Sequence, residues 1–197
     1  MGRGKSGAPE SSDSQKRGGD LKALSNVDIE KAGCVLWMPF RERVMWDASD
    51  LPAELPLIVD SPAPYFIWND SPKGTHWTAV LIDMIHRTAY VFNSMGLPLD
   101  QPVVDALHKH LRIRSVVSND SPIQASDSAS CGYWAVYFLY TAMARINTAL
   151  ALKRVRPPYL FRNAYRYVMD MFSTDDYKRN EEFIEGWWRA RGLPFPR

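Results

Sequence analysis

The fold of this chain is decided by residues 128–144, SASCGYWAVYFLYTAMA. The first residues are small and polar, and a nearly unbroken apolar run follows from Tyr133. A helix that is apolar on most of its faces is buried, because it has no polar face to offer to water. We therefore predict a central, buried helix from Cys131 to about Ile146, with Cys131 in its first turn.

Cys131 stands at a position where a helix favours a thiolate. The positive end of the helix dipole and the free N–H groups of the first turn both stabilise a negative sulfur. The same backbone can donate a hydrogen bond to a developing oxyanion. A lone cysteine is more often an inert core residue, so Cys131 by itself leaves both interpretations open.

Two apolar runs upstream of this helix predict a β-hairpin. Residues 77–82, WTAVLI, and residues 88–92, TAYVF, are joined by a short loop around Asp83–His86. This spacing places His76 directly opposite Asn93, with their Cβ atoms about 5 Å apart. The Asn93 oxygen can then accept one ring N–H of His76 and leave the other ring nitrogen for a nucleophile.

The other titratable groups near this hairpin fit a catalytic role less well. Asp83 is a rival partner for His76, but an odd separation along the strand points it to the opposite face. His86 falls in the turn, and His108 and His110 fall on a later helix, where all three look solvated or structural.

Weaker patterns complete the secondary structure. Ser25 and Asp28 have the spacing of a capping box and predict a helix that ends at Gly33. The remaining predictions are strands at 65–68 and 115–117, a helix opened by Asp100, and helices at about 158–171 and 175–191.

The composition sets limits on fold and function. The chain has 197 residues, 46% of them apolar, and a net charge of +2, which suits one folded domain and gives no global field for nucleic acid. Its two cysteines, Cys34 and Cys131, exclude a disulfide scaffold and favour a reducing, intracellular compartment. No apolar run reaches the ~20 residues that span a bilayer. Residues 1–22 predict a disordered, mildly basic tail, and residues 23–197 a single domain.

Gln124 is a fourth candidate residue, beside His76, Asn93 and Cys131. It lies in a polar loop, and its side-chain amide can donate a hydrogen bond to an oxyanion. In chain order, His76, Asn93, Gln124 and Cys131 resemble the catalytic residues of adenain, the adenovirus endopeptidase. The separations of 17 positions from His to Asn and seven from Gln to Cys match that family. The resemblance is closest to adenain-like proteases of Polinton-type elements and related DNA viruses, and more distant to SUMO-specific proteases. It is carried by GTHW at 74–77, FNSMG at 92–96, DSASCG at 127–132 and LSNVDIE at 24–30.

This resemblance implies an α+β fold of the papain-like or adenain-like type, in which a mixed central sheet packs on the buried helix that carries the nucleophile. It implies that Cys131 is the nucleophile and His76 the general base. Asn93 then orients the imidazole and Gln124 donates to the oxyanion. Most relatives have Asp or Glu in place of Asn93; a neutral amide orients the ring without stabilising imidazolium by charge. Trp77 is expected in the wall of a substrate groove or in the core.

The function implied is a cysteine endopeptidase that matures viral capsid precursors at Gly-containing sites, as a monomer in the host nucleus or the virion. The sequence requires no cofactor and no metal, and DNA and an activating peptide stay open as cofactors. Adenain bonds its activating peptide through a disulfide, and Cys34 lies in a different part of the chain, so that activator is not transferred. Two other functions stay open: a protease for ubiquitin-like modifiers, and a DNA-binding virion protein with a degenerate active site.

A basic segment supports the DNA interpretation. Between Arg145 and Arg166 there is no acidic residue, and Tyr159, Phe161 and Tyr165 interleave with the basic ones. Such a patch suits phosphate contacts with occasional base stacking, although a solvated helix face balanced by later acidic residues explains it equally well. The candidate DNA-binding residues are Arg145, Lys153, Arg154, Arg156, Arg162 and Arg166.

Overall fold

The computed structural model describes residues 21–38, 44–45, 63–70, 76–152 and 157–196. Within these residues, no helix is both long enough and apolar enough to cross a membrane. The elements in chain order are α1 (Asn26–Leu36), β1 (Val44–Met45), β2 (Tyr65–Asn69), β3 (Trp77–Asp83), β4 (Thr88–Phe92), α3 (Gln101–Leu111), β5 (Ser115–Ser118), α4 (Cys131–Ala151), α5 (Pro157–Met169) and α6 (Tyr177–Ala190).

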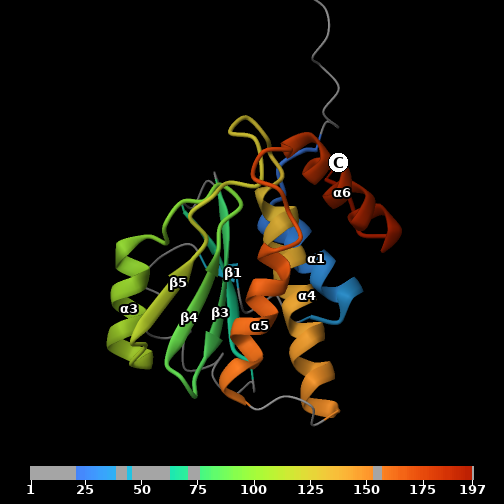
Figure 1. Cartoon of the computed structure of the whole chain (residues 1–197). Helices are drawn as coiled ribbons and strands as arrows, with labels where there is room; N and C mark the ends of the chain where they lie inside the picture. The colour runs from blue at the N-terminus through green and yellow to red at the C-terminus, as the bar shows by residue number, and fades with distance from the viewer. Residues whose placement is uncertain (1–20, 39–43, 46–62, 71–75, 153–156, 197) are drawn as a thin grey trace, which may run out of the picture.

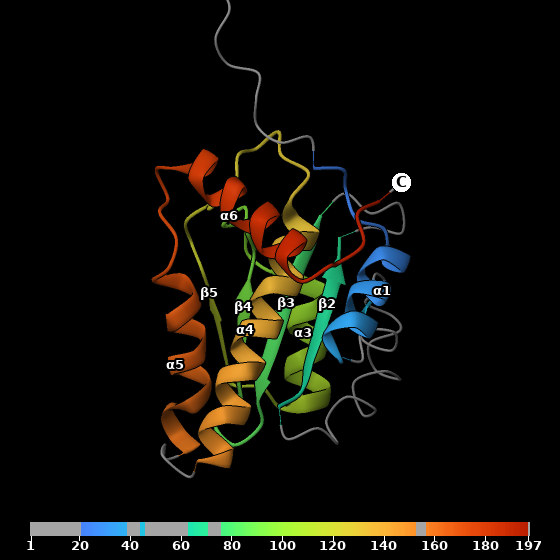
Figure 2. The same ribbon diagram turned by 90° about the vertical axis from the view of Figure 1, so that its right-hand side faces the viewer.

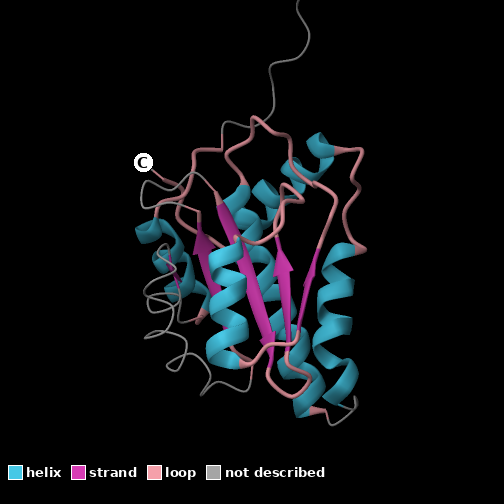
Figure 3. Ribbon diagram, turned by 90° about the vertical axis from the view of Figure 1, so that its left-hand side faces the viewer, coloured by secondary structure: helices cyan, strands magenta, loops and turns pink. Residues whose placement is uncertain are grey.

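The strands form one mixed sheet in the order β1-β2-β3-β4-β5. The two inner pairs, β2 with β3 and β3 with β4, are antiparallel, and the two outer pairs are parallel. Helix α3 covers one face of the sheet, while α4 and α5 lie on the other (Figure 1; Figure 3 shows α3 in front of the strands). The prediction of an α+β fold, with a mixed sheet packed on a buried helix that begins at Cys131, is confirmed.

Strand β3 lies at the centre of this arrangement and all seven of its residues are buried. Because side chains alternate across a strand, Ala79 and Leu81 join the core shared with α4, whereas Val80 and Ile82 join the core shared with α3. Burial on both faces explains the continuous apolar run that the sequence shows there.

Helix α4 is the buried helix of the fold. Every residue from Cys131 to Leu139 is buried, and this half of the helix packs on β3. Figure 2 shows α4 in front of the sheet with α5 beside it, while α6 lies across the end where α4 begins. The first turn of α4 is therefore enclosed by the sheet and by α6.

Helix α1 begins where predicted and ends later. The Ser25 side chain accepts from the Asp28 N–H, and the Asp28 carboxylate accepts from the Ser25 N–H at 3.0 Å, which is a capping box. The predicted end at Gly33 is wrong, because the helix runs on to Leu36 and ends at Trp37, whose φ is 57°. Gly33 is buried inside the helix, where it serves packing instead of chain reversal.

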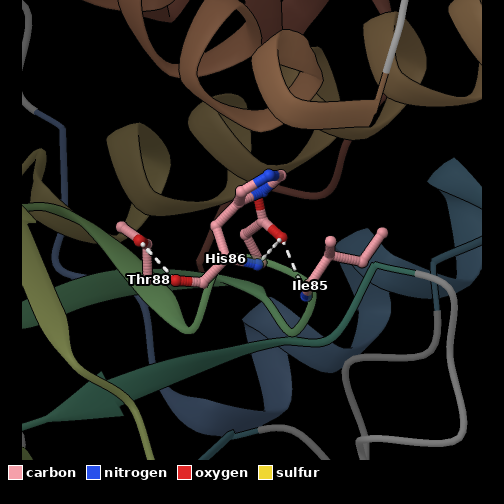
Figure 4. Close-up of polar contacts among 4 residues, drawn as sticks. Ile85, His86 and Thr88 are labelled. Carbon is pink, nitrogen blue, oxygen red and sulfur yellow. Dashed lines mark hydrogen bonds and ion pairs between the residues drawn. The ribbon is translucent and has the colours of Figure 1, made fainter.

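The predicted register of the hairpin is also wrong, by two residues. Strand β3 extends to Asp83, which pairs with Thr88, so the loop is residues 84–87. The cause is the Asp83 side chain, which accepts from the N–H groups of Ile85 and His86 at 3.0 Å each and bonds the His86 ring at 2.7 Å (Figure 4). Through these contacts the last residue of the strand closes the turn. The sequence alone does not show that Asp83 has this role.

The predicted tail falls mostly on residues 1–20, which lie outside the described residues. The two described residues of that range contact the domain. Leu21 packs against the larger core, and the Lys22 carbonyl accepts a 3.0 Å hydrogen bond from the Tyr133 hydroxyl. Both residues thus pack on the same body as the rest of the described chain.

Candidate functional site

The imidazole of His76 is bound to Asn93, as expected, although the two residues are not directly opposite. The ring Nε2 lies 2.8 Å from Asn93 Oδ1. In the observed register Thr78 takes the place opposite Asn93, and His76 is its diagonal neighbour. A shift of two residues keeps every side chain on the same face of the sheet, so the pair still meets.

Asn93 is held so that its oxygen faces the ring. Its Nδ2 donates to Thr78 Oγ1 at 3.2 Å, and its Oδ1 also accepts from the Met95 N–H at 2.9 Å. The Asn119 side chain bonds both the Asn93 N–H, at 2.8 Å, and the Asn93 carbonyl, at 2.6 Å. An oxygen in this place accepts a hydrogen bond from the Nε2–H, which leaves Nδ1 without a hydrogen in the neutral tautomer.

The backbone of His76 is fixed as well. Its N–H donates to Asp70 Oδ1 at 3.0 Å, and its carbonyl accepts from the Asp70 N–H at 3.2 Å. These bonds fix His76 just before β3 begins. At this end of the strand its side chain is only partly buried. Asp83, the rival partner of this histidine, is bound to His86 at the far end of the same strand.

Cys131 is the first residue of α4 and is only 6% exposed. Burial raises the pKa of its thiol and the charge of Asp70 adds to the rise, while the backbone N–H groups of Trp77, Gly132 and Cys131 itself donate toward the sulfur and lower the pKa. The Trp77 contact brings the sulfur beside the main chain of the residue that follows His76. The first residue of α4 thus lies beside the start of β3, directly after His76.

The direction of this pKa corrects one expectation. We expected the helix terminus to favour the thiolate, but the loss of water around a buried sulfur outweighs the helix. The resting site therefore favours a thiol that still carries its proton.

Gln124 is 2% exposed and lies in a network that joins three segments. Its Oε1 accepts from Ser94 Oγ at 2.6 Å and from Ser130 Oγ at 3.4 Å, and its Nε2 donates to the Ser128 carbonyl at 3.2 Å. The carbonyl of Ser128 can only accept, which fixes the orientation of the amide. One amide hydrogen is used in this way, and the second is the one that could serve an oxyanion.

Two residues of α6 hold this loop from outside. Asn180 Nδ2 donates to the Ile123 carbonyl at 2.9 Å and to the Ser173 carbonyl at 2.6 Å. The Glu181 carboxylate accepts a 3.3 Å hydrogen bond from Ser130 Oγ, on the residue before Cys131. The sequence analysis missed Asn180, Glu181 and the serines, because a polar residue on an amphipathic helix or in a loop carries no signal that it is buried.

The structure places Trp77 in the core. It is 3% exposed, and its indole N–H donates to the Leu24 carbonyl at 3.0 Å. A Cβ on Gly132 would lie 3.1 Å from both Trp77 Cδ1 and Leu24 Cβ, so the indole fills the space beside the first turn of α4. Of the two places expected for Trp77, the structure has the core and not the groove wall, because the segment before α1 covers the ring.

The basic segment keeps only part of the expected stacking surface. Phe161 and Tyr165 are each only 6% exposed and belong to the larger core, which removes them as platforms for bases, whereas Tyr159 is 57% exposed. Arg145 lies over the Tyr167 ring, with Cζ 3.5 Å from its centroid, whereas Arg162 and Arg166 are exposed on α5. The other candidates, Lys153, Arg154 and Arg156, lie outside the described residues.

The chemistry of the site needs no metal ligand set, and the described residues contain no group of three His, Cys, Asp or Glu side chains that could hold an ion. A sulfur on a helix N-terminus, an imidazole oriented by an amide and an amide near the same helix end can together perform nucleophilic attack on a carbonyl.

No protein-family model matches the chain, and neither does any curated protein sequence. Solved structures that are similar include a protease of ASFV, with a TM-score of 0.48 and 14% identity over 89% of this chain and 68% of that one. The SUMO protease Ulp1 has a TM-score of 0.44 and 14% identity over 75% of this chain and 81% of its own. The Chlamydia abortus effector protein ChlaDUB has a TM-score of 0.48 and 12% identity over 90% of this chain and 95% of its own. At such values these similarities carry no argument about activity or substrate, which must come from the site itself.

Proposed function

We propose that the protein is a cysteine endopeptidase in which Cys131 is the nucleophile and His76 the general base. The observation that carries the proposal is the 2.8 Å bond from His76 Nε2 to Asn93, on a strand whose next N–H reaches the Cys131 sulfur. A structural histidine has no need of a free nitrogen beside a helix-terminal thiol, whereas a general base does.

The first half of the reaction starts from the protonated thiol. As the sulfur attacks the scissile carbonyl carbon, its proton passes to His76 Nδ1 and the carbonyl π electrons move to oxygen. The backbone N–H of Cys131 and the second amide hydrogen of Gln124 bind the resulting oxyanion. The oxyanion then collapses, the C–N bond breaks, and the amine leaves with the proton of the imidazolium, so that a thioester remains.

Water completes the cycle. His76 takes a proton from the water as its oxygen attacks the thioester carbon, and the C–S bond breaks. The sulfur regains a proton from the imidazolium, and the carboxylic product leaves. Asn93 keeps the ring in one orientation through both steps but adds no charge.

Substitution of the nucleophile tests the proposal. Cys131→Ala is expected to lower cleavage of a protein or peptide substrate by more than about a thousandfold, while Cys34→Ala, which changes the exposed cysteine, leaves the rate unchanged. Iodoacetamide is expected to inactivate the Cys34→Ala variant as it does the wild type. Cleavage that survives Cys131→Ala removes the proposal.

The limited access to the sulfur favours substrates with glycine at the cut. Cys131, Asn93 and Gln124 are each 6% exposed or less, so a chain with bulky side chains at the scissile bond would have to displace the walls of the site. Together with the resemblance to adenain, this supports maturation of capsid precursors at Gly-containing sites as the biological role.

A protease for ubiquitin-like modifiers is the second candidate, and the same restricted access favours it, because a Gly-containing tail would reach the sulfur equally well. A fusion of a ubiquitin-like domain to a reporter, compared with a free peptide of the same Gly-containing sequence, separates the two. A kcat/KM much higher for the fusion supports recognition of the modifier itself. Equal values support recognition of the cleavage sequence alone.

A further inference from the structure

A groove runs along the helical layer, away from the candidate catalytic residues. It is lined by α4 from Tyr137 to Leu152, by α5 from Leu160 to Tyr167, and by Trp187 and Arg191 at the end of α6, and its volume is about 620 Å³. None of His76, Asn93, Gln124 and Cys131 lines it. At 1.5 Å per residue, the α4 wall alone is roughly 22 Å long, the length of about six residues of extended chain.

Two arginines stand in this groove, each stacked on aromatic rings. The Arg145 Cζ lies 3.5 Å from the Tyr167 centroid. The Arg191 Cζ lies 4.2 Å from the centroid of Trp187 and 5.3 Å from that of Tyr140. A guanidinium stacked in this way is held in place, and its N–H donors stay in the plane of the group, where they can bind an anion with two parallel hydrogen bonds.

Neither arginine has a carboxylate partner among the residues that the structure describes. The ion pairs found there join His86 to Asp83, Lys178 to Glu182 and Arg189 to Glu185. Arg189, two residues before Arg191, is thus paired with a carboxylate on its own helix. The charges of the two groove arginines have no such partner among the described residues. The groove is complementary to an anionic partner.

The two guanidinium groups lie in one groove, over rings that belong to different helices. Arg145 lies over Tyr167 of α5, and Arg191 lies over Trp187 of α6. An extended chain brings every second side chain to the same side. Acidic residues at alternate positions of such a chain would therefore present a row of carboxylates to the groove.

The rest of the lining favours a peptide over a nucleic acid. One face each of Tyr167 and Trp187 carries an arginine, which reduces the aromatic surface on which bases could stack. The remaining wall is mixed: its aliphatic residues include Leu152, which is 51% exposed, and its polar residues include Thr148 and Asn163. We propose that the groove binds an extended acidic segment of a partner protein, with carboxylates at alternate positions and an aliphatic side chain against Leu152.

Fluorescence anisotropy with the full-length protein tests this proposal. The probe is a labelled peptide with Glu-Leu-Glu-Leu at its centre, and the matched probe has Gln-Leu-Gln-Leu. The acidic probe is expected to bind, and Arg145→Gln and Arg191→Gln are each expected to weaken it about tenfold, the effect of losing one charged hydrogen-bonding partner. Arg179→Gln, an exposed arginine of α6 outside the groove, is the control and leaves binding unchanged.

Three outcomes overturn the proposal. One is the absence of binding by the acidic probe, and another is equal binding of the Gln-Leu-Gln-Leu probe. The third is a short oligothymidylate that binds, is lost in Arg145→Gln and Arg191→Gln, and displaces the acidic peptide, which would make the groove a nucleic-acid site. The assay does not depend on catalysis: Cys131→Ala is expected to bind the acidic probe like the wild type, so failure of the proposed peptidase activity leaves this test intact.

Discussion

Asn93 shows how one neutral side chain can fix the chemistry of another. Its oxygen accepts from the His76 ring and from the Met95 N–H, and its amide nitrogen is committed to Thr78. The Met95 N–H can only donate, so it fixes the amide with its oxygen toward His76, and the bond to that oxygen selects the tautomer with hydrogen on Nε2. Asparagine here supplies position without charge.

Replacement of Asn93 separates these two contributions. Asn93→Ala removes a buried hydrogen bond worth about 1–3 kcal/mol, and we expect kcat to fall by roughly ten- to a hundredfold with little change in KM. Asn93→Asp keeps the acceptor and adds a charge that favours imidazolium, so its rate should stay close to that of the wild type at alkaline pH. The acidic limb of its kcat profile should move to higher pH, because His76 must be neutral to take the thiol proton. Steady-state kinetics across pH measures both. A kcat unchanged in Asn93→Ala would show that the ring needs no partner.

The pH dependence of Cys131 alkylation follows from its burial. Because burial raises the pKa of this thiol, the sulfur keeps its proton to higher pH than in the unfolded chain, and less thiolate is present at any given pH. The alkylation rate of the folded Cys34→Ala variant should therefore rise at higher pH than that of the same variant in denaturant. The rate constant for iodoacetamide, followed by mass, measures this. A folded-state curve displaced to lower pH would instead reveal an ion pair with His76.

At the scale of elements, the loops that carry Asn93 and Gln124 meet at one glycine. Gly96 has a φ of +67°, and a Cβ there would lie 2.7 Å from the Ser121 carbonyl carbon and 2.8 Å from Pro122 N. The N–H groups of Ile123 and Gln124 donate to the Ser94 carbonyl at 2.8 and 3.2 Å. This close approach sets the Gln124 amide beside the segment that also presents Asn93.

Two glycine substitutions separate backbone strain from steric overlap. Gly192 also has a positive φ, +62°, but nothing lies within 4 Å of its would-be Cβ, so Gly192→Ala should cost about 1 kcal/mol from strain alone. Gly96→Ala adds overlap with backbone that cannot move aside, and we expect a loss of about 2–4 kcal/mol in the free energy of unfolding. Urea denaturation measures both. Equal losses would mean that the two loops are not tightly joined.

The elements that the sequence predicts well are those whose signal is local. The sequence predicts β4 with its observed bounds, and β3, β5 and the start of α4 to within one residue. These features depend on residues that are neighbours in the sequence, such as a continuous apolar run or the first turn of a helix. The register of the hairpin was missed because it depends on the side chain of Asp83. The position of the His76–Asn93 pair survived this error only because the shift was even.

At the scale of the whole molecule, the candidate site depends on the last helix of the chain. The site is formed by the residue just before β3, by the segment after β4, by the Gln124 loop and by the start of α4. Helix α6 closes it from outside through Asn180 and Glu181. No sequence pattern links α6 to a catalytic role, since its polar residues have the spacing of an ordinary amphipathic helix. The dependence follows from tertiary contacts alone.

Asn180→Ala tests whether this distant helix positions the Gln124 loop. Asn180 is 3% exposed, and its loss leaves the carbonyls of Ile123 and Ser173 without their donor, so we expect the protein to lose about 2–4 kcal/mol of stability. Because Ile123 precedes Gln124, kcat should fall even under conditions in which circular dichroism shows the variant fully folded. Arg179→Ala changes the exposed neighbour on the same turn and should alter neither quantity. If Asn180→Ala loses stability but keeps its kcat, α6 supports the fold without positioning the oxyanion donor, and the loop is held by Ser94 and Ser130 alone.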